Sequence, residues 1–99
     1  GPLFFGAADR INQIETREET KCLVLRMRAV PAVDSTAMNS MVALYERCQK
    51  NGVTLILSHV NEQPMRAMEK AGFVDLVGRE NFCRNIEEAL DHADKVLEK

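Results

Sequence analysis

This chain is most constrained by two short, continuous apolar runs that are separated by enough sequence for a helix. The first is Cys22-Leu23-Val24-Leu25, the centre of a strand predicted over Lys21 to Arg28, and the second is Val53-Thr54-Leu55-Ile56-Leu57. A continuous apolar run, in contrast to an alternating one, is typical of a strand that is covered on both faces. We therefore expect the second run to lie centrally in a β-sheet.

Amphipathic segments follow each of these runs. Ser35 to Asn51 predicts a helix that ends at Asn51-Gly52. A second helix contains Pro64 in its first turn, where the missing N–H is harmless, and ends at Gly72, with Met65 and Met68 facing inwards. The apolar face of the first helix consists of Met38, Met41, Val42, Tyr45 and Cys48.

The last helix is predicted from the sequence Asn85-Ile86-Glu87-Glu88, which resembles a capping box. Two further short strands are expected, at Leu3-Phe4-Phe5 and at Phe73 to Val77. Strands that alternate with helices in this way predict an α/β fold. The apolar stripe of the last helix consists of Ile86, Ala89, Leu90, Ala93, Val96 and Leu97.

Composition narrows the class of protein. The 99 residues are 45% hydrophobic and 28% charged, which fits one small globular domain. The formal net charge is −2 and the basic residues are scattered, so a nucleic-acid partner is not expected. No apolar run approaches the ~20 residues of a membrane-spanning helix, and the start lacks the form of a signal peptide.

The cysteines and histidines form no recognisable catalytic or metal-binding pattern. Cys22, Cys48 and Cys83 are odd in number, widely spaced and free of a CxxC motif, which fits a reducing, cytosolic setting. Neither a zinc site nor a thiol nucleophile with its base is indicated. We therefore expect no metal, no cofactor and no enzymatic activity.

The junction between the first long strand and the first long helix is the main candidate for a functional site. Asp34, Ser35 and Thr36 stand where that helix begins. We expect the Asp34 side chain to accept a hydrogen bond from the backbone N–H of Thr36 or Ala37. The hydroxyls then lie at the positive end of the helix dipole, a position that suits an anion, a phosphate group or a partner. A purely structural capping role for Asp34 stays open beside this one.

Three segments, by their order and spacing, resemble a STAS domain. They are Gly1-Pro2-Leu3-Phe4-Phe5-Gly6-Ala7-Ala8, Val30-Pro31-Ala32-Val33-Asp34-Ser35-Thr36, and Val60-Asn61-Glu62-Gln63-Pro64 through Ala71-Gly72-Phe73. They are similar to the STAS domain at the cytoplasmic C-terminus of SulP-type anion transporters, a group that includes sulfate, bicarbonate and dicarboxylate carriers. Residues 1–99 are therefore interpreted as a single STAS domain that lacks the first N-terminal strand of the family.

The resemblance implies an α/β fold with a small mixed β-sheet and helices packed mainly on one face. It implies a non-catalytic regulatory domain on the cytoplasmic side of the inner (plasma) membrane, within an integral membrane protein. The implied partners are the transmembrane domain of the same transporter, a second copy in a homodimer and, by family analogy, a kinase or an acyl carrier protein. The expected interaction surface comprises Asp34-Ser35-Thr36 and the loop Asn61-Glu62-Gln63-Pro64.

A free-standing signalling protein is the alternative. In the related anti-sigma-factor antagonists, the serine after the junction aspartate is phosphorylated by a partner kinase, and phosphorylation releases the partner. Ser35 holds that position here. Antagonists usually read Asp-Ser-Ser-Gly where this chain has Asp34-Ser35-Thr36-Ala37, and the Gly-Pro-Leu-Phe-Phe start is typical of the transporter branch. The transporter interpretation is therefore preferred.

Overall fold

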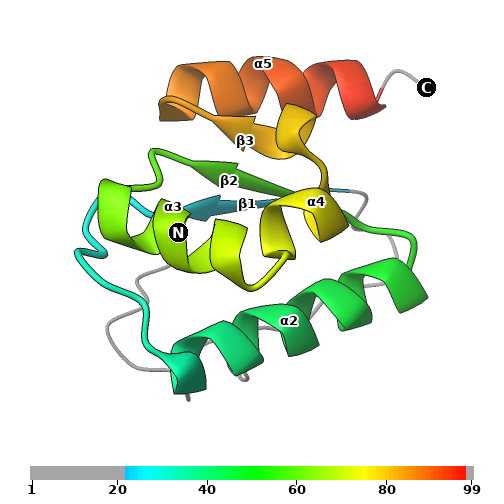
Figure 1. Cartoon of the computed structure of the whole chain (residues 1–99). Helices are drawn as coiled ribbons and strands as arrows, with labels where there is room; N and C mark the ends of the chain where they lie inside the picture. Colours follow the sequence, from blue (N-terminus) through cyan, green and yellow to red (C-terminus); the bar gives the residue numbers. More distant parts are fainter. Residues whose placement is uncertain (1–21, 98–99) are drawn as a thin grey trace.

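The computed structural model describes residues 22–97, which form a three-stranded sheet and four α-helices (Figure 1). In chain order the elements are β1 (Cys22–Arg26), α2 (Ser35–Lys50), β2 (Thr54–Ser58), α3 (Glu62–Lys70), α4 (Phe73–Val77), the 3-10 turn η1 (Arg79–Asn81), β3 (Phe82–Cys83) and α5 (Ile86–Leu97).

The described sheet is parallel, with the order β1-β2-β3. In its register Leu23 lies beside Leu55 and Leu57 beside Phe82. Parallel neighbours need a crossover connection, which α2 supplies between β1 and β2 and which α3 and α4 supply between β2 and β3. The predicted α/β fold and the central position of the second apolar run are confirmed. The expected strand at Leu3-Phe4-Phe5, and with it any antiparallel pairing of a mixed sheet, lies outside the described residues.

Side chains of β1 and β2 alternate between two apolar clusters on opposite faces of the sheet. Leu25 and Leu57 belong to the larger cluster, which α2, α3 and α4 cover. Ile56 belongs to the smaller cluster and packs with Ala89 and Ala93 of α5. Figure 1 shows α5 on one side of the sheet and α2 on the other. The central strand β2 is therefore buried on both faces, and three of the four described helices share one face, as predicted.

Helix α2 presents the predicted apolar face to the sheet. Met38, Met41 and Cys48 are buried, and Val42 and Tyr45 pack against the same cluster. The Tyr45 ring also meets the Phe73 ring edge-on, with centroids 6.3 Å apart. In α3, Met68 is fully buried and Met65 packs against the core at its margin.

The predicted strand at Phe73 to Val77 is wrong, because this segment is the short helix α4. Gly72 adopts a left-handed conformation, with φ of 75°, and turns the chain directly from α3 into α4. Phe73, Val74 and Val77 then bury one helical face, a spacing that a short apolar run does not distinguish from a strand. The third described strand is instead the two-residue β3.

The predicted apolar stripe of α5 is only partly buried. Ala89 and Ala93 are buried, whereas Leu90 and Leu97 are exposed over about half of their surface, at 53% and 54%. The predicted cap is confirmed, because the Glu88 N–H donates to the Asn85 side chain over 2.8 Å. Small residues at the centre of the stripe let α5 lie close to the sheet, which explains why the bulkier leucines project beside it.

Truncating the core beneath α2 should be costly. We expect Leu57→Ala to lower the free energy of unfolding by about 2–5 kcal/mol, because Leu57 is fully buried and the change leaves a cavity. The control is Leu76→Ala on α4, where the leucine is 48% exposed and the expected change is within about 0.5 kcal/mol. Urea denaturation measures both, and equal effects would contradict this account of the core.

Candidate functional site

The loop between β1 and α2 is held against the start of α3 by two side chains. The Asn61 side-chain amide donates to the Arg28 and Val30 carbonyls, over 3.0 and 2.9 Å. Gln63 accepts from the Val33 N–H over 2.8 Å, and its amide donates to the Val33 carbonyl over 3.4 Å. The predicted junction and the predicted loop are therefore brought together into one surface.

Asn61 precedes α3 at the N-cap position, yet its side chain makes no cap hydrogen bond within the helix. Its amide nitrogen is directed to the loop carbonyls instead. An asparagine at a helix start normally indicates capping, so sequence reasoning missed this role in positioning the loop.

Asp34 forms the predicted cap of α2. Its carboxylate accepts a hydrogen bond from the Ala37 N–H over 2.8 Å, one of the two donors that the sequence predicted. Ser35 and Thr36 are exposed in the first turn that follows. Both residues therefore lie at the positive end of the helix, next to the Asp34 cap.

The predicted loop divides into exposed and buried members. Glu62 is exposed and pairs with Arg66 over 3.5 Å, an ion pair that contributes little at such exposure. Pro64 is fully buried, so its ring supports the core and does not belong to a contact surface. The exposed candidates that remain are Asp34, Ser35, Thr36, Glu62 and Gln63, with Asn61 half-buried.

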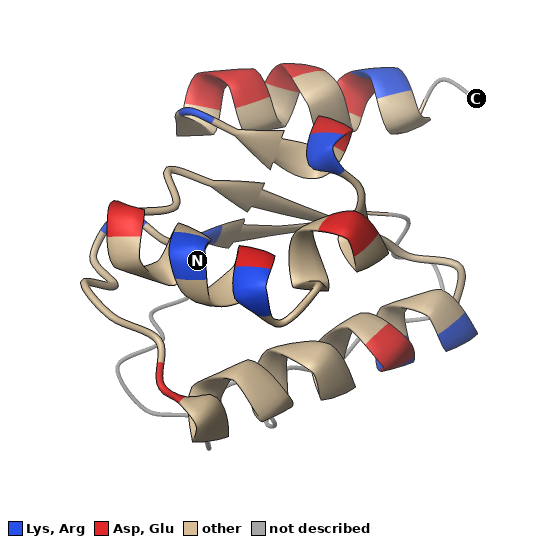
Figure 2. Ribbon diagram, in the orientation of Figure 1, with Lys and Arg blue, Asp and Glu red and all other residues tan. Residues whose placement is uncertain are grey.

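Charge is unevenly distributed over the described residues. Figure 2 shows several acidic residues along α5, whereas Lys and Arg are spread over α2, α3, η1 and both ends of α5. Arg26 is the last residue of β1, His59 follows β2, and Arg84 follows β3. Sequence reasoning missed this arrangement, although a basic residue at the end of each of three apolar strands was the signal that could have revealed it.

The three thiols lack the environment of a nucleophile. Burial raises the pKa of Cys22, Cys48 and Cys83 above the ordinary value of a thiol. Activation requires the opposite shift, because the thiolate is the reactive form. Within residues 22–97, no three His, Cys, Asp or Glu side chains lie close enough together to hold a metal ion.

None of the helices in residues 22–97 has the length and apolar character that crossing a membrane requires.

Comparison with known proteins identifies the family of this domain. The sequence matches the family model of the STAS domain over residues 1–89. The chain belongs to the STAS domain family. The predicted resemblance is therefore confirmed.

Two solved structures resemble this STAS domain over essentially its whole length. The crystal structure of a sulfate transporter family protein from Wolinella succinogenes is 38% identical with a TM-score of 0.84, covering 100% of this chain and 83% of the other. The STAS domain of a SulP transporter from Vibrio cholerae is 30% identical with a TM-score of 0.78, covering 98% and 77%. The fold and the homology to SulP-type STAS domains are thus established.

Curated relatives are much longer proteins. Probable sulfate transporter 4.2 of Arabidopsis thaliana is 31% identical over 68 residues, which are 69% of this chain and 10% of the relative. Solute carrier family 26 member 10 of Mus musculus is 26% identical over 76 residues, which are 77% and 11%. This STAS domain therefore spans about a tenth of the length of the relatives it matches.

Removing the Asn61 amide should loosen the loop without unfolding the domain. We expect Asn61→Ala to cost about 1–2 kcal/mol of stability, because two carbonyls lose their donor but one of them can turn to water. Amide hydrogen exchange of residues 27–33 should accelerate. Asn39→Ala, on the exposed face of α2, is the control and should leave exchange in this loop unchanged.

Proposed function

We propose that this STAS domain is the cytosolic regulatory and protein-interaction domain of a SulP-type membrane anion transporter, one that carries sulfate, bicarbonate or a dicarboxylate. The observation that carries the proposal is the 38% identity and TM-score of 0.84 with a sulfate transporter family protein over the full chain. The domain itself is non-catalytic in this proposal, and the anion crosses the membrane elsewhere in the protein.

The surface that supports this role is the pair of helix starts that Asn61 and Gln63 connect. Asp34, Ser35 and Thr36 on α2 and Glu62 on α3 are exposed on it. Because the loop between them is anchored, a partner would meet a surface that is already ordered, which lowers the entropic cost of binding. Regulation would then act by stabilising one state of the transporter over another.

The partner in this proposal is the transmembrane domain of the same protein, which places the STAS domain on the cytoplasmic side of the inner (plasma) membrane. A homodimer of STAS domains is a second arrangement consistent with an exposed, ordered surface. A kinase or an acyl carrier protein as regulator rests on the family analogy.

Membrane association of the full gene product tests the proposal directly. An antibody raised against this domain should detect a band far larger than 11.2 kDa that resists an alkaline carbonate wash of the membranes. A band of about the size of this chain in the supernatant would overturn the transporter assignment.

A charge placed on the interaction surface should alter transport while leaving the fold intact. We expect Ser35→Asp in the full-length protein to change sulfate uptake by proteoliposomes about fivefold or more, a typical coupling between sites. Thermal stability should change little, because attraction by the helix dipole and repulsion by the neighbouring Asp34 carboxylate oppose each other. Asn39→Asp, which adds the same charge on the exposed face of α2, should leave uptake unchanged. Uptake by Ser35→Asp equal to that of the unmodified protein would remove this surface from the proposal.

The second candidate function is a free-standing phospho-switch of the anti-sigma-factor antagonist kind. The exposure of Ser35 at the first position of α2, beside the Asp34 cap, favours it. A phosphate there would be attracted by the helix dipole and repelled by the Asp34 carboxylate, so it would alter docking more than folding.

Intact mass spectrometry separates the two candidates. In lysate of the source cells with ATP, the phospho-switch predicts the gain of one phosphate on the wild-type domain and none on Ser35→Ala. Thr36→Ala is the matched control and should still be phosphorylated. Absence of any phosphate on the wild-type domain would exclude the switch.

A further inference from the structure

A pocket opens at the edge of the sheet where β2 and β3 end. Its volume is about 220 Å³, and it is lined by His59, Val60, Met65, Phe82, Cys83 and Arg84. The pocket lies beyond the carboxyl ends of two neighbouring parallel strands. It is separate from the Asp34-Ser35-Thr36 surface proposed above, since none of those three residues lines it.

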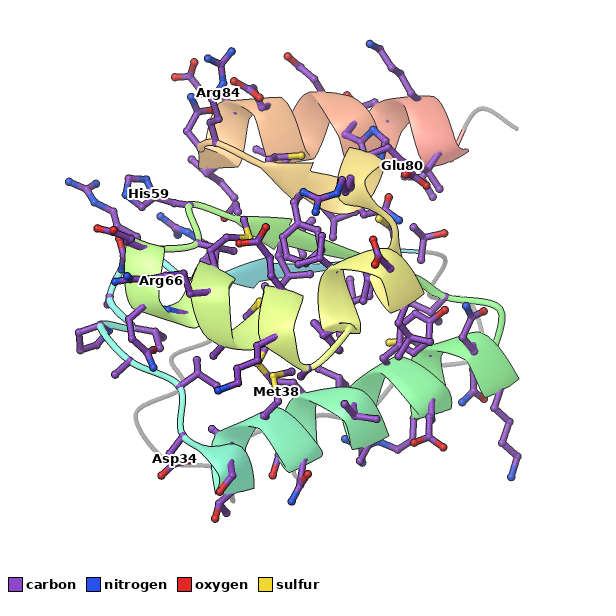
Figure 3. The ribbon with its side chains drawn as sticks, viewed as in Figure 1. Asp34, Met38, His59, Arg66, Glu80 and Arg84 are labelled. Atoms are coloured by element: carbon purple, nitrogen blue, oxygen red, sulfur yellow. The ribbon has the colours of Figure 1, made fainter. Side chains whose placement is uncertain are left out.

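The lining joins apolar walls to two groups that bind anions. Val60, Met65 and Phe82 supply the apolar walls. The His59 imidazole and the Arg84 guanidinium supply hydrogen-bond donors, and Figure 3 shows both side chains at the same end of the sheet. The Cys83 thiol adds no charge at neutral pH, because burial raises its pKa.

His59 adopts a left-handed backbone conformation that is uncommon for non-glycine residues. Its φ of 53° makes it the single non-glycine residue with a positive φ among the described residues. The His59 N–H donates to the Cys83 carbonyl over 2.9 Å, which ties the ends of the two strands together. Glycine or asparagine would fit this conformation at lower cost, and backbone strain of this kind concentrates at functional sites.

Arg84 is restrained by a carboxylate of the same chain. The guanidinium Nε donates to a Glu88 side-chain oxygen over 3.0 Å, across one turn at the start of α5. The Arg84 side chain remains 89% exposed, so an incoming carboxylate can reach it. Glu88 therefore occupies the guanidinium in the way that an external carboxylate would, and it competes with such a ligand.

From this arrangement we propose that the pocket binds a small organic carboxylate, with the carboxylate on Arg84 and His59 and the apolar body against Val60, Met65 and Phe82. The guanidinium matches the planar geometry of a carboxylate. A volume of about 220 Å³ is below the usual range for drug-sized ligands, which disfavours a nucleotide. Sulfate would leave the apolar walls without a partner. This carboxylate site is distinct from the interaction surface proposed above, and the proposal does not depend on whether the domain belongs to a transporter.

Three small molecules, each tested for binding to the 99-residue chain, show whether a ligand needs both a negative charge and an apolar body. Butyrate carries both, sulfate only the charge, and 1-butanol only the apolar body. In NMR titrations at constant ionic strength, butyrate should shift His59, Met65 and Arg84 resonances saturably, with a dissociation constant on the order of millimolar. Sulfate and 1-butanol should bind about tenfold more weakly. Equal binding of sulfate or of 1-butanol, or no saturable shift with butyrate, would overturn the proposal.

Substitutions of the assigned residues should weaken butyrate binding in some variants and strengthen it in another. Arg84→Gln should weaken butyrate binding about tenfold, because a charged hydrogen bond is lost. Glu88→Gln should strengthen it about threefold, because the competing carboxylate is removed. His59→Asn should weaken binding without loss of stability, since asparagine tolerates the left-handed conformation. Arg79→Gln, which removes an exposed arginine outside this pocket, is the control and should leave the affinity unchanged. An unchanged affinity in Arg84→Gln, or weakened binding in Glu88→Gln, would contradict the assignment.

Discussion

Burial of β2 on both faces is the constraint on which the rest of this structure depends. A strand without a solvent-exposed face needs backbone partners on both sides and apolar cover above and below, and β1, β3, α2 and α5 supply these. Parallel pairing then brings the carboxyl ends of all three described strands to one edge. The chain must leave the sheet at that edge three times. Both the surface at the starts of α2 and α3 and the pocket lie at this edge, where the loops that follow the three strands come close together.

Loops at such an edge carry backbone groups that secondary structure does not satisfy. Here the Arg28, Val30 and Val33 carbonyls would lack partners from any ladder, and the amides of Asn61 and Gln63 supply donors. Side chains at the start of one crossover helix therefore order the loop that leads into another. These hydrogen bonds explain why the surface formed by the starts of α2 and α3 is ordered. It also couples α2 and α3, since a partner that displaced Asn61 would release the loop before Asp34.

Much of the fold could be predicted from sequence, because continuous apolar runs and helical spacing report burial directly. The Asp34 cap could also be predicted, because capping is local. The helix at Phe73–Val77 could not, since four apolar residues in a segment of five fit either period, and the left-handed Gly72 turns the chain directly into this helix. The roles of Asn61 and Gln63 could not be predicted either, because their partners lie about 30 residues away in the chain. The same holds for the presence of His59 and Arg84 in one pocket lining, which depends on the register of β2 with β3.

The two sites at this edge differ in what they offer a partner, and the difference follows from charge. The helix starts present the Asp34 and Glu62 carboxylates beside two hydroxyls, whereas the pocket presents a guanidinium and an imidazole beside apolar walls. A partner drawn to one is therefore not drawn to the other. Yet Val60 lines the pocket and Asn61, the next residue, holds the loop before Asp34. A ligand that shifted the Val60 backbone would move the Asn61 donor relative to its two carbonyl acceptors. The pocket lining and the anchor of the loop before Asp34 therefore share the peptide unit between Val60 and Asn61.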